Sequence, residues 1–145
     1  MKKKLKKMWF LLPVLFAFFF LPNTSPLRWD GSIVHMTHDY FNFTKSLLEG
    51  KVLYTDLYDH KGLYLYVLYI IPVWISKHSF SGVFLFEGIV SAGIALSCYN
   101  YCRTRYNSVK SCLVTWTTVL MLFIAFPSPM LNTEPLCLIL IFLLL

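Results

Sequence analysis

Long apolar stretches alternate with polar ones along the 145-residue chain. A membrane-spanning helix requires about 20 predominantly apolar residues, so the chain has room for about four spans. One long polar stretch, residues 23–62, interrupts the pattern. We therefore predict an all-α, integral, multi-pass membrane protein with about four spans and one long loop. The apolar stretches cover residues 8–22, 63–76, 80–101, 111–126 and 138–145.

The composition supports this class and excludes several others. Hydrophobic residues make up 57% of the chain and charged residues 14%, whereas a soluble domain carries about 25% charged residues. A small globule could not hide so much apolar surface, which excludes a soluble enzyme. Four cysteines, six glycines and seven prolines are too few for a disulfide-rich secreted module or a disordered tail.

The last apolar run, 138–145, has no polar flank and no basic stop. A helix that ended inside the bilayer would leave carbonyl groups unsatisfied. We therefore expect residues 1–145 to form a single transmembrane domain, the amino-terminal part of a longer membrane domain. A genuine short half-helix is the alternative.

The basic residues predict the orientation. The net charge is +6, but five of the 13 basic residues lie just before the first apolar stretch, where they mark a cytoplasmic anchor rather than a nucleic-acid surface. No small-residue cleavage site follows residue 22, which favours an uncleaved first span over a signal peptide. We predict a multi-pass protein of the cell membrane with a cytoplasmic amino terminus. The five residues are Lys2, Lys3, Lys4, Lys6 and Lys7.

Segment 63–76 is the one apolar stretch that we do not expect to cross. It is short, contains Pro72, and carries tyrosines, which prefer the membrane interface. If it does not cross, the basic 103–110 connection faces the cytoplasm, as the amino terminus does. The segment is then a juxtamembrane or re-entrant helix, and residues 23–79 and 127–135 lie on the outer face.

Within the polar stretch, residues 40–48 have the pattern of a short amphipathic helix that lies on the membrane surface. Asp39 is a suitable residue to cap its start, and Gly50 is suitable to end it.

The segment from Gly50 to Gly62 contains two carboxylates, a histidine and a lysine close together. A cation above a membrane-dipping helix suits a phosphate group, and a nearby carboxylate can accept a proton from a sugar-acceptor hydroxyl. The segment suits the handling of a lipid-linked phosphate, although a loop also keeps polar residues simply because it is solvated. The residues concerned are Asp56, Asp59, His60 and Lys61.

The spacing Gly50-Lys51-x-x-Tyr54-x-Asp56-x-x-Asp59-His60-Lys61-Gly62 resembles a motif of the GT-C superfamily of membrane glycosyltransferases. More narrowly, it resembles the family-39-like group, which includes protein mannosyltransferases and the lipid A aminoarabinose transferase. Asn132-Thr133-Glu134 resembles an outer N-x-T-E motif of the same group. Leu63 departs from the group, which usually has proline there. The spans that follow in the family are missing, so the chain alone is expected to be inactive.

The resemblance implies an inverting sugar transfer from a polyprenyl-phosphate donor to an envelope glycan, lipid or protein on the outer face. It implies an acidic residue of the first outer loop as the base, for which Asp39 and Asp30 are the candidates. Lys61 and His60 would contact the donor phosphate. Asp56, Asp59 and Glu134 would bind the acceptor or organise the site. No nucleotide-binding motif occurs, and no nucleic-acid partner is expected.

Other polar residues fit simpler roles. His35 and His38 could share a metal ion on a helix, but no third ligand is evident, so we assign no metal or cofactor, without excluding a divalent ion. Glu87 lies inside an apolar segment, where ionisable groups are costly and often functional. The alternative function is a non-enzymatic membrane protein that binds lipid phosphates, such as a flippase-like or polysaccharide-export subunit.

Overall fold

The computed structural model describes residues 9–22, 24–27, 34–58 and 62–125, without the side chains of 34–38. In these ranges the chain forms five α-helices and no strand, which confirms the all-α class. The helices are α2 (Leu11–Phe20), α3 (Val34–Leu48), α4 (Leu63–Ile75), α5 (Ser81–Arg105) and α6 (Ser108–Ala125).

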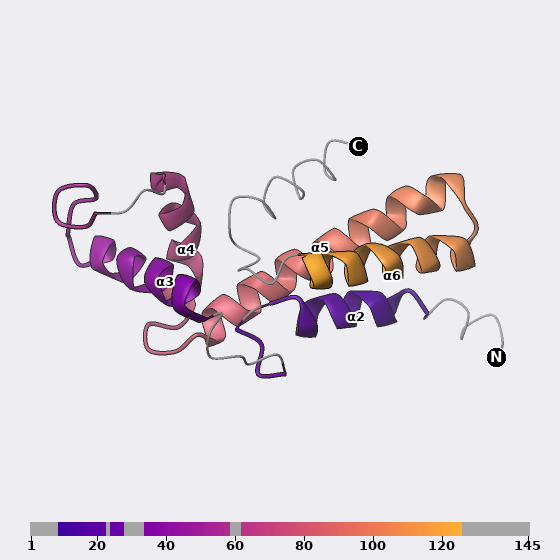
Figure 1. Cartoon of the computed structure of the whole chain (residues 1–145), viewed down its shortest axis with the longest axis horizontal. Coiled ribbons are helices and arrows are strands. Elements are labelled where there is room, and N and C mark those ends of the chain that lie inside the picture. Colours follow the sequence, from indigo (N-terminus) through magenta and orange to yellow (C-terminus); the bar gives the residue numbers. More distant parts are fainter. Residues whose placement is uncertain (1–8, 23, 28–33, 59–61, 126–145) are drawn as a thin grey trace.

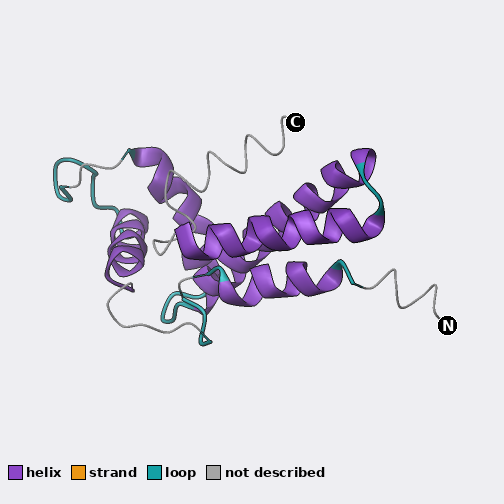
Figure 2. Ribbon diagram, turned by 45° about the vertical axis from the view of Figure 1, so that its right-hand side comes forward, coloured by secondary structure: helices purple, strands orange, loops and turns teal. Residues whose placement is uncertain are grey.

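Helices α2, α5 and α6 lie side by side as a bundle (Figures 1 and 2). Its core is apolar and comes from all three helices: Ala17 of α2 packs with Ile94 of α5 and Val119 of α6. Gly88 allows α2 and α5 to approach closely, because a Cβ atom there would lie 2.9 Å from the Phe18 ring and 3.0 Å from its carbonyl oxygen.

The start of α2 and the α5–α6 connection lie close together at one end of this bundle. The Cys112 thiol donates to the Trp9 carbonyl at 3.5 Å, and the Phe10 and Tyr99 rings stack with centroids 5.1 Å apart. The predicted topology requires this proximity, because it puts the amino terminus and the basic 103–110 connection on the same side of the membrane.

Helices α3 and α4 lie beyond the opposite end, where α5 begins (Figure 1). They pack through aromatic side chains, with the Tyr40 ring against Tyr66 and Tyr69. The buried Thr44 hydroxyl lies 2.8 Å from the Tyr40 carbonyl and 3.3 Å from the Tyr66 carbonyl, so it donates within α3 and across to α4. The α4–α5 junction is tighter still, since a Cβ atom on Gly82 would meet the Pro72 carbonyl oxygen.

Two helices are long and apolar enough to cross a membrane, α5 with 25 residues and α6 with 18. At about 1.5 Å per residue they extend about 37 Å and about 27 Å, close to the ~30 Å hydrocarbon core of a bilayer. The apolar α2 and α4 are shorter, with 10 and 13 residues. The fourth predicted span, 138–145, lies outside the described residues.

The helix predicted over residues 40–48 is present but begins earlier than residue 40. Helix α3 starts at Val34, so Asp39 is its sixth residue and does not cap its start. No glycine or proline occurs in 34–39 to stop the helix, and an aspartate can occupy an exposed helix position at a small cost. The predicted end is confirmed. Gly50 has φ +93°, and the amides of Gly50 and Lys51 donate to the Leu47 and Ser46 carbonyls, which is a Schellman motif.

Accessibility mapping tests whether α4 crosses. In a cysteine-free chain, we expect single cysteines at Lys51 and Lys77, which flank α4, to react with an impermeant maleimide added outside intact cells. A cysteine at Lys110 should react only after permeabilisation. The reason is that 13 residues span about 20 Å, less than the hydrocarbon core. Labelling at position 51 without labelling at position 77 would show that α4 crosses.

Candidate functional site

The described part of the motif segment folds into a compact turn. The Tyr54 amide donates to the Leu57 carbonyl at 2.8 Å, and the Asp56 amide donates to the Val52 carbonyl at 2.9 Å. The Asp56 carboxylate in turn accepts a hydrogen bond from the Val52 amide at 2.8 Å. Tyr54 has φ +66°, so this tight turn requires a left-handed residue. Asp56 therefore holds the shape of the loop.

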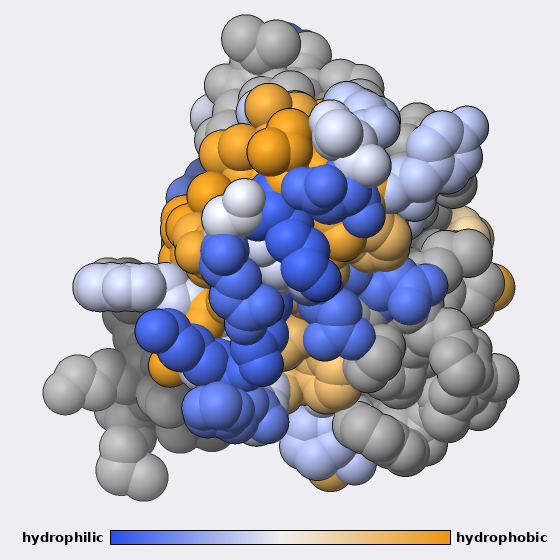
Figure 3. All heavy atoms as spheres, turned by 90° about the vertical axis from the view of Figure 1, so that its left-hand side faces the viewer, coloured by the Kyte–Doolittle hydropathy of each residue, from blue (hydrophilic) through white to orange (hydrophobic). Residues whose placement is uncertain are grey.

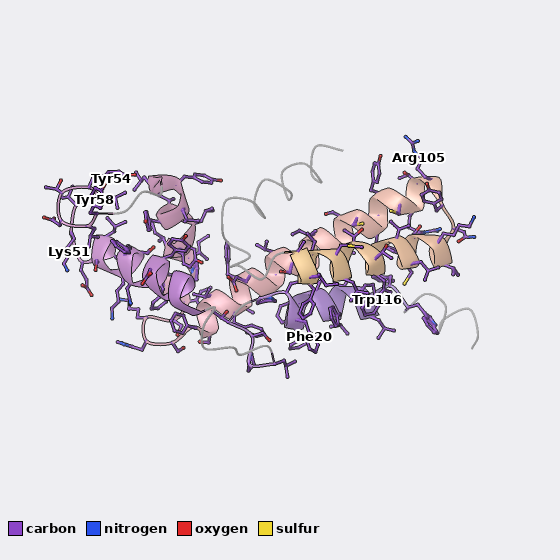
Figure 4. All side chains as sticks on the ribbon, viewed as in Figure 1. Phe20, Lys51, Tyr54, Tyr58, Arg105 and Trp116 are labelled. Carbon is purple, nitrogen blue, oxygen red and sulfur yellow. The ribbon has the colours of Figure 1, made fainter. Side chains whose placement is uncertain are left out.

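The turn lies at the end of the molecule that carries α3 and α4. Lys51, Tyr54 and Tyr58 are at this end and Arg105 is at the other (Figure 4). Hydrophilic side chains gather on the same end (Figure 3).

The structure places only part of the predicted site. Asp39 is exposed on α3, and Asp56 lies in the turn that follows this helix. The other candidates, Asp30, Asp59, His60, Lys61 and Glu134, lie outside the described residues.

A cavity of about 250 Å³ opens between α3 and the α4–α5 connection. Three of its lining residues come from α3 and four from the connection, so the packing of α3 against α4 creates it. This cavity could not be predicted from the sequence. It is lined by Phe41, Asn42, Lys45, Lys77, His78, Ser79 and Phe80.

Three serine hydroxyls order the α4–α5 connection. The Ser76 and Ser79 hydroxyls lie 2.7 Å apart, and those of Ser79 and Ser81 lie 2.6 Å apart. The Ser81 amide also donates to the Ser79 hydroxyl at 3.4 Å. This chain of hydrogen bonds fixes the turn that carries Lys77 and His78.

The cavity is cationic. Lys45 is half-buried, while Lys77 and His78 are exposed, and no carboxylate is among the lining residues. The Phe41 and Phe80 rings pack against each other, with centroids 5.3 Å apart, and form its apolar wall. Two ammonium groups beside an apolar wall favour an anionic group that is attached to an apolar body.

A second polar feature lies inside the bundle. Glu87 is fully buried in the second turn of α5, and its Oε2 accepts a hydrogen bond from the Thr24 hydroxyl at 3.2 Å. The Ser25 hydroxyl donates to the Phe19 carbonyl. The chain that leaves α2 is thereby joined to α5. The sequence identified Glu87 as unusual, and the structure shows that its side chain does not reach the surface.

Among the described residues, no three His, Cys, Asp or Glu side chains are grouped so that they could hold a metal ion. Comparison of the chain with protein-family models, curated proteins and solved structures finds no match. The resemblance to GT-C glycosyltransferases therefore depends on the motif residues themselves.

Proposed function

We propose that the chain belongs to a membrane glycosyltransferase of the GT-C type. In this proposal it is a multi-pass protein of the cell membrane with a cytoplasmic amino terminus and about four spans. It transfers a sugar from a polyprenyl-phosphate donor to an envelope acceptor on the outer face. The observation that supports it most is the position of the motif turn and of Asp39, which lie with α3 and α4 beyond the end of an apolar bundle. A reaction on a lipid-linked donor requires polar groups at such a place.

The chemistry assigns a role to each group. A carboxylate, Asp39 or Asp30, takes the proton of the acceptor hydroxyl. The oxygen of that hydroxyl attacks the anomeric carbon of the sugar. The bond between that carbon and the phosphate oxygen breaks, and polyprenyl phosphate leaves with the electron pair. Lys61 and His60 stabilise the charge of the leaving phosphate. Asp59 and Glu134 contact the acceptor, and Asp56 shapes the loop through the Val52 amide.

The Asp39→Asn variant tests the base. We expect it to lower the transfer rate by about 100-fold or more, because asparagine cannot accept the proton, while binding of the donor persists. The measurement uses membranes containing the full-length protein and a radiolabelled polyprenyl-phosphate sugar, with Asp30→Asn assayed in parallel. Glu49→Gln, which removes an exposed carboxylate at the end of α3, is the matched control and should transfer at the wild-type rate.

Retained transfer in both aspartate variants would refute the assigned base. Donor binding without any transfer by the full-length wild-type protein would instead favour a protein that only binds lipid phosphates.

A further inference from the structure

We infer that the cavity between α3 and the α4–α5 connection binds the phosphate headgroup of an anionic phospholipid of the surrounding bilayer. The three groups involved are Lys45, Lys77 and His78. The inference concerns a lipid of the membrane and is independent of sugar transfer.

The charges of the cavity favour an anionic ligand. Lys45 comes from α3 and Lys77 from the connection, so two lysines from separate elements line one cavity. Its lining residues include no carboxylate, and among the described residues neither lysine forms an ion pair. A phosphodiester supplies the missing negative charge and accepts several hydrogen bonds, which the lysines can donate. A zwitterionic headgroup would bring its own cation next to them.

The size of the cavity favours a headgroup over a larger ligand. Pockets for whole small molecules measure about 300–1,000 Å³, and this one measures about 250 Å³. It is far larger than the ~30 Å³ share of a water molecule. A phosphate with a short polar substituent therefore fits, whereas the acyl chains must remain outside.

The surroundings put the cavity at the depth of lipid headgroups. Helix α4 leads into the connection and exposes an apolar face, including Ile71 at 48% and Trp74 at 78%. Exposed tryptophans are typical of the membrane interface, and Trp74 precedes Lys77 by three residues, close to the end of α4 at Ile75. The acyl chains can thus lie along the apolar face of α4, next to the Phe41 and Phe80 wall, while the phosphate contacts the lysines.

Two features prepare the site before a lipid binds. The serine hydroxyl chain from Ser76 to Ser81 fixes the connection, and the absence of a side chain at Gly82 allows the start of α5 to touch Pro72. Lipid binding then requires little further ordering of the backbone, so less conformational entropy is lost and the affinity is higher.

The Lys45→Gln/Lys77→Gln double variant of the full chain tests the site. The delipidated protein in detergent is titrated with dioctanoyl phosphatidylglycerol, and the bound lipid is counted by native mass spectrometry. We expect binding to weaken by roughly 10- to 30-fold, because each lysine near a headgroup contributes about 1 kcal/mol. The matched control, Arg105→Gln/Lys110→Gln, removes two cations from the opposite end and should change binding by less than about twofold. Equal losses in the two double variants would overturn the inference.

Three other ligands distinguish the possible sources of the phosphate. Dioctanoyl phosphatidylcholine should bind at least about tenfold more weakly than phosphatidylglycerol, and inorganic phosphate should not displace the lipid at millimolar concentration. If either expectation fails, the site does not select an anionic phospholipid. If polyprenyl phosphate binds more tightly than phosphatidylglycerol and displaces it, the cavity is a donor site and the inference is wrong.

Amine footprinting of the wild-type protein tests the site without any substitution. Phosphatidylglycerol should protect Lys45 and Lys77 from acetylation and leave Lys110 unprotected, as compared with phosphatidylcholine. Lack of protection at both lysines would contradict the inference even if the double variant bound lipid poorly.

Discussion

Replacement of Gly82 by alanine is expected to destabilise the fold more than any other single methyl addition among the described glycines. A Cβ atom at this position would lie 2.2 Å from the Pro72 carbonyl oxygen and 3.1 Å from its carbonyl carbon. Backbone atoms cannot move aside as a flexible side chain can, so α4 and α5 must separate. Overpacking of this kind lowers the free energy of unfolding by about 1–3 kcal/mol and occasionally more. Because the clash is with backbone atoms, we expect the loss for Gly82→Ala to be near the upper end of this range.

Unfolding of the purified protein in mixed detergent, followed by circular dichroism, measures this effect. Gly93→Ala is the matched control, because nothing lies within 4 Å of a Cβ atom at Gly93, which is also on α5. Alanine favours a helix over glycine by about 1 kcal/mol, so Gly93→Ala should be neutral or stabilising. If Gly82→Ala were as stable as Gly93→Ala, the close contact between α4 and α5 would be refuted.

The helices could be predicted from the sequence because their signals are local. The apolar runs indicated the positions of α2, α4, α5 and α6, and Gly50 indicated where α3 ends. The start of α3 could not be placed as well. Asp39 has the side chain of a helix cap, yet the residues before it also favour or tolerate a helix, and nothing local decides between the two.

The cavity could not be predicted, for a different reason. Lys45 and Lys77 are distant in sequence, and tertiary packing, such as that of Tyr40 against Tyr66 and Phe41 against Phe80, brings their elements together. Each lysine alone is an ordinary surface residue. A partial signal was present, since Lys77 and His78 directly follow an apolar helix, where cations meet lipid headgroups.

The second large effect is expected for Glu87→Ala. The side chain is fully buried where the chain leaving α2 meets α5, and it accepts a hydrogen bond from Thr24. Alanine removes both the packed volume and the acceptor. Large-to-small changes in a core cost about 2–5 kcal/mol, and a lost hydrogen bond to a buried group costs about 1–3 kcal/mol. We therefore expect the free energy of unfolding to fall by about 3 kcal/mol or more.

Two further variants separate these contributions. Glu87→Gln keeps the volume and an oxygen that can accept from Thr24, so it should retain most of the stability. Thr24→Val keeps the shape of Thr24 but removes the donor, and should cost about 1 kcal/mol. If Glu87→Gln were as damaging as Glu87→Ala, the bundle would require the acid itself rather than its shape and acceptor oxygen. If Glu87→Ala lowered the free energy of unfolding by less than about 0.5 kcal/mol relative to the wild-type protein, the burial of this side chain between the helices would be refuted.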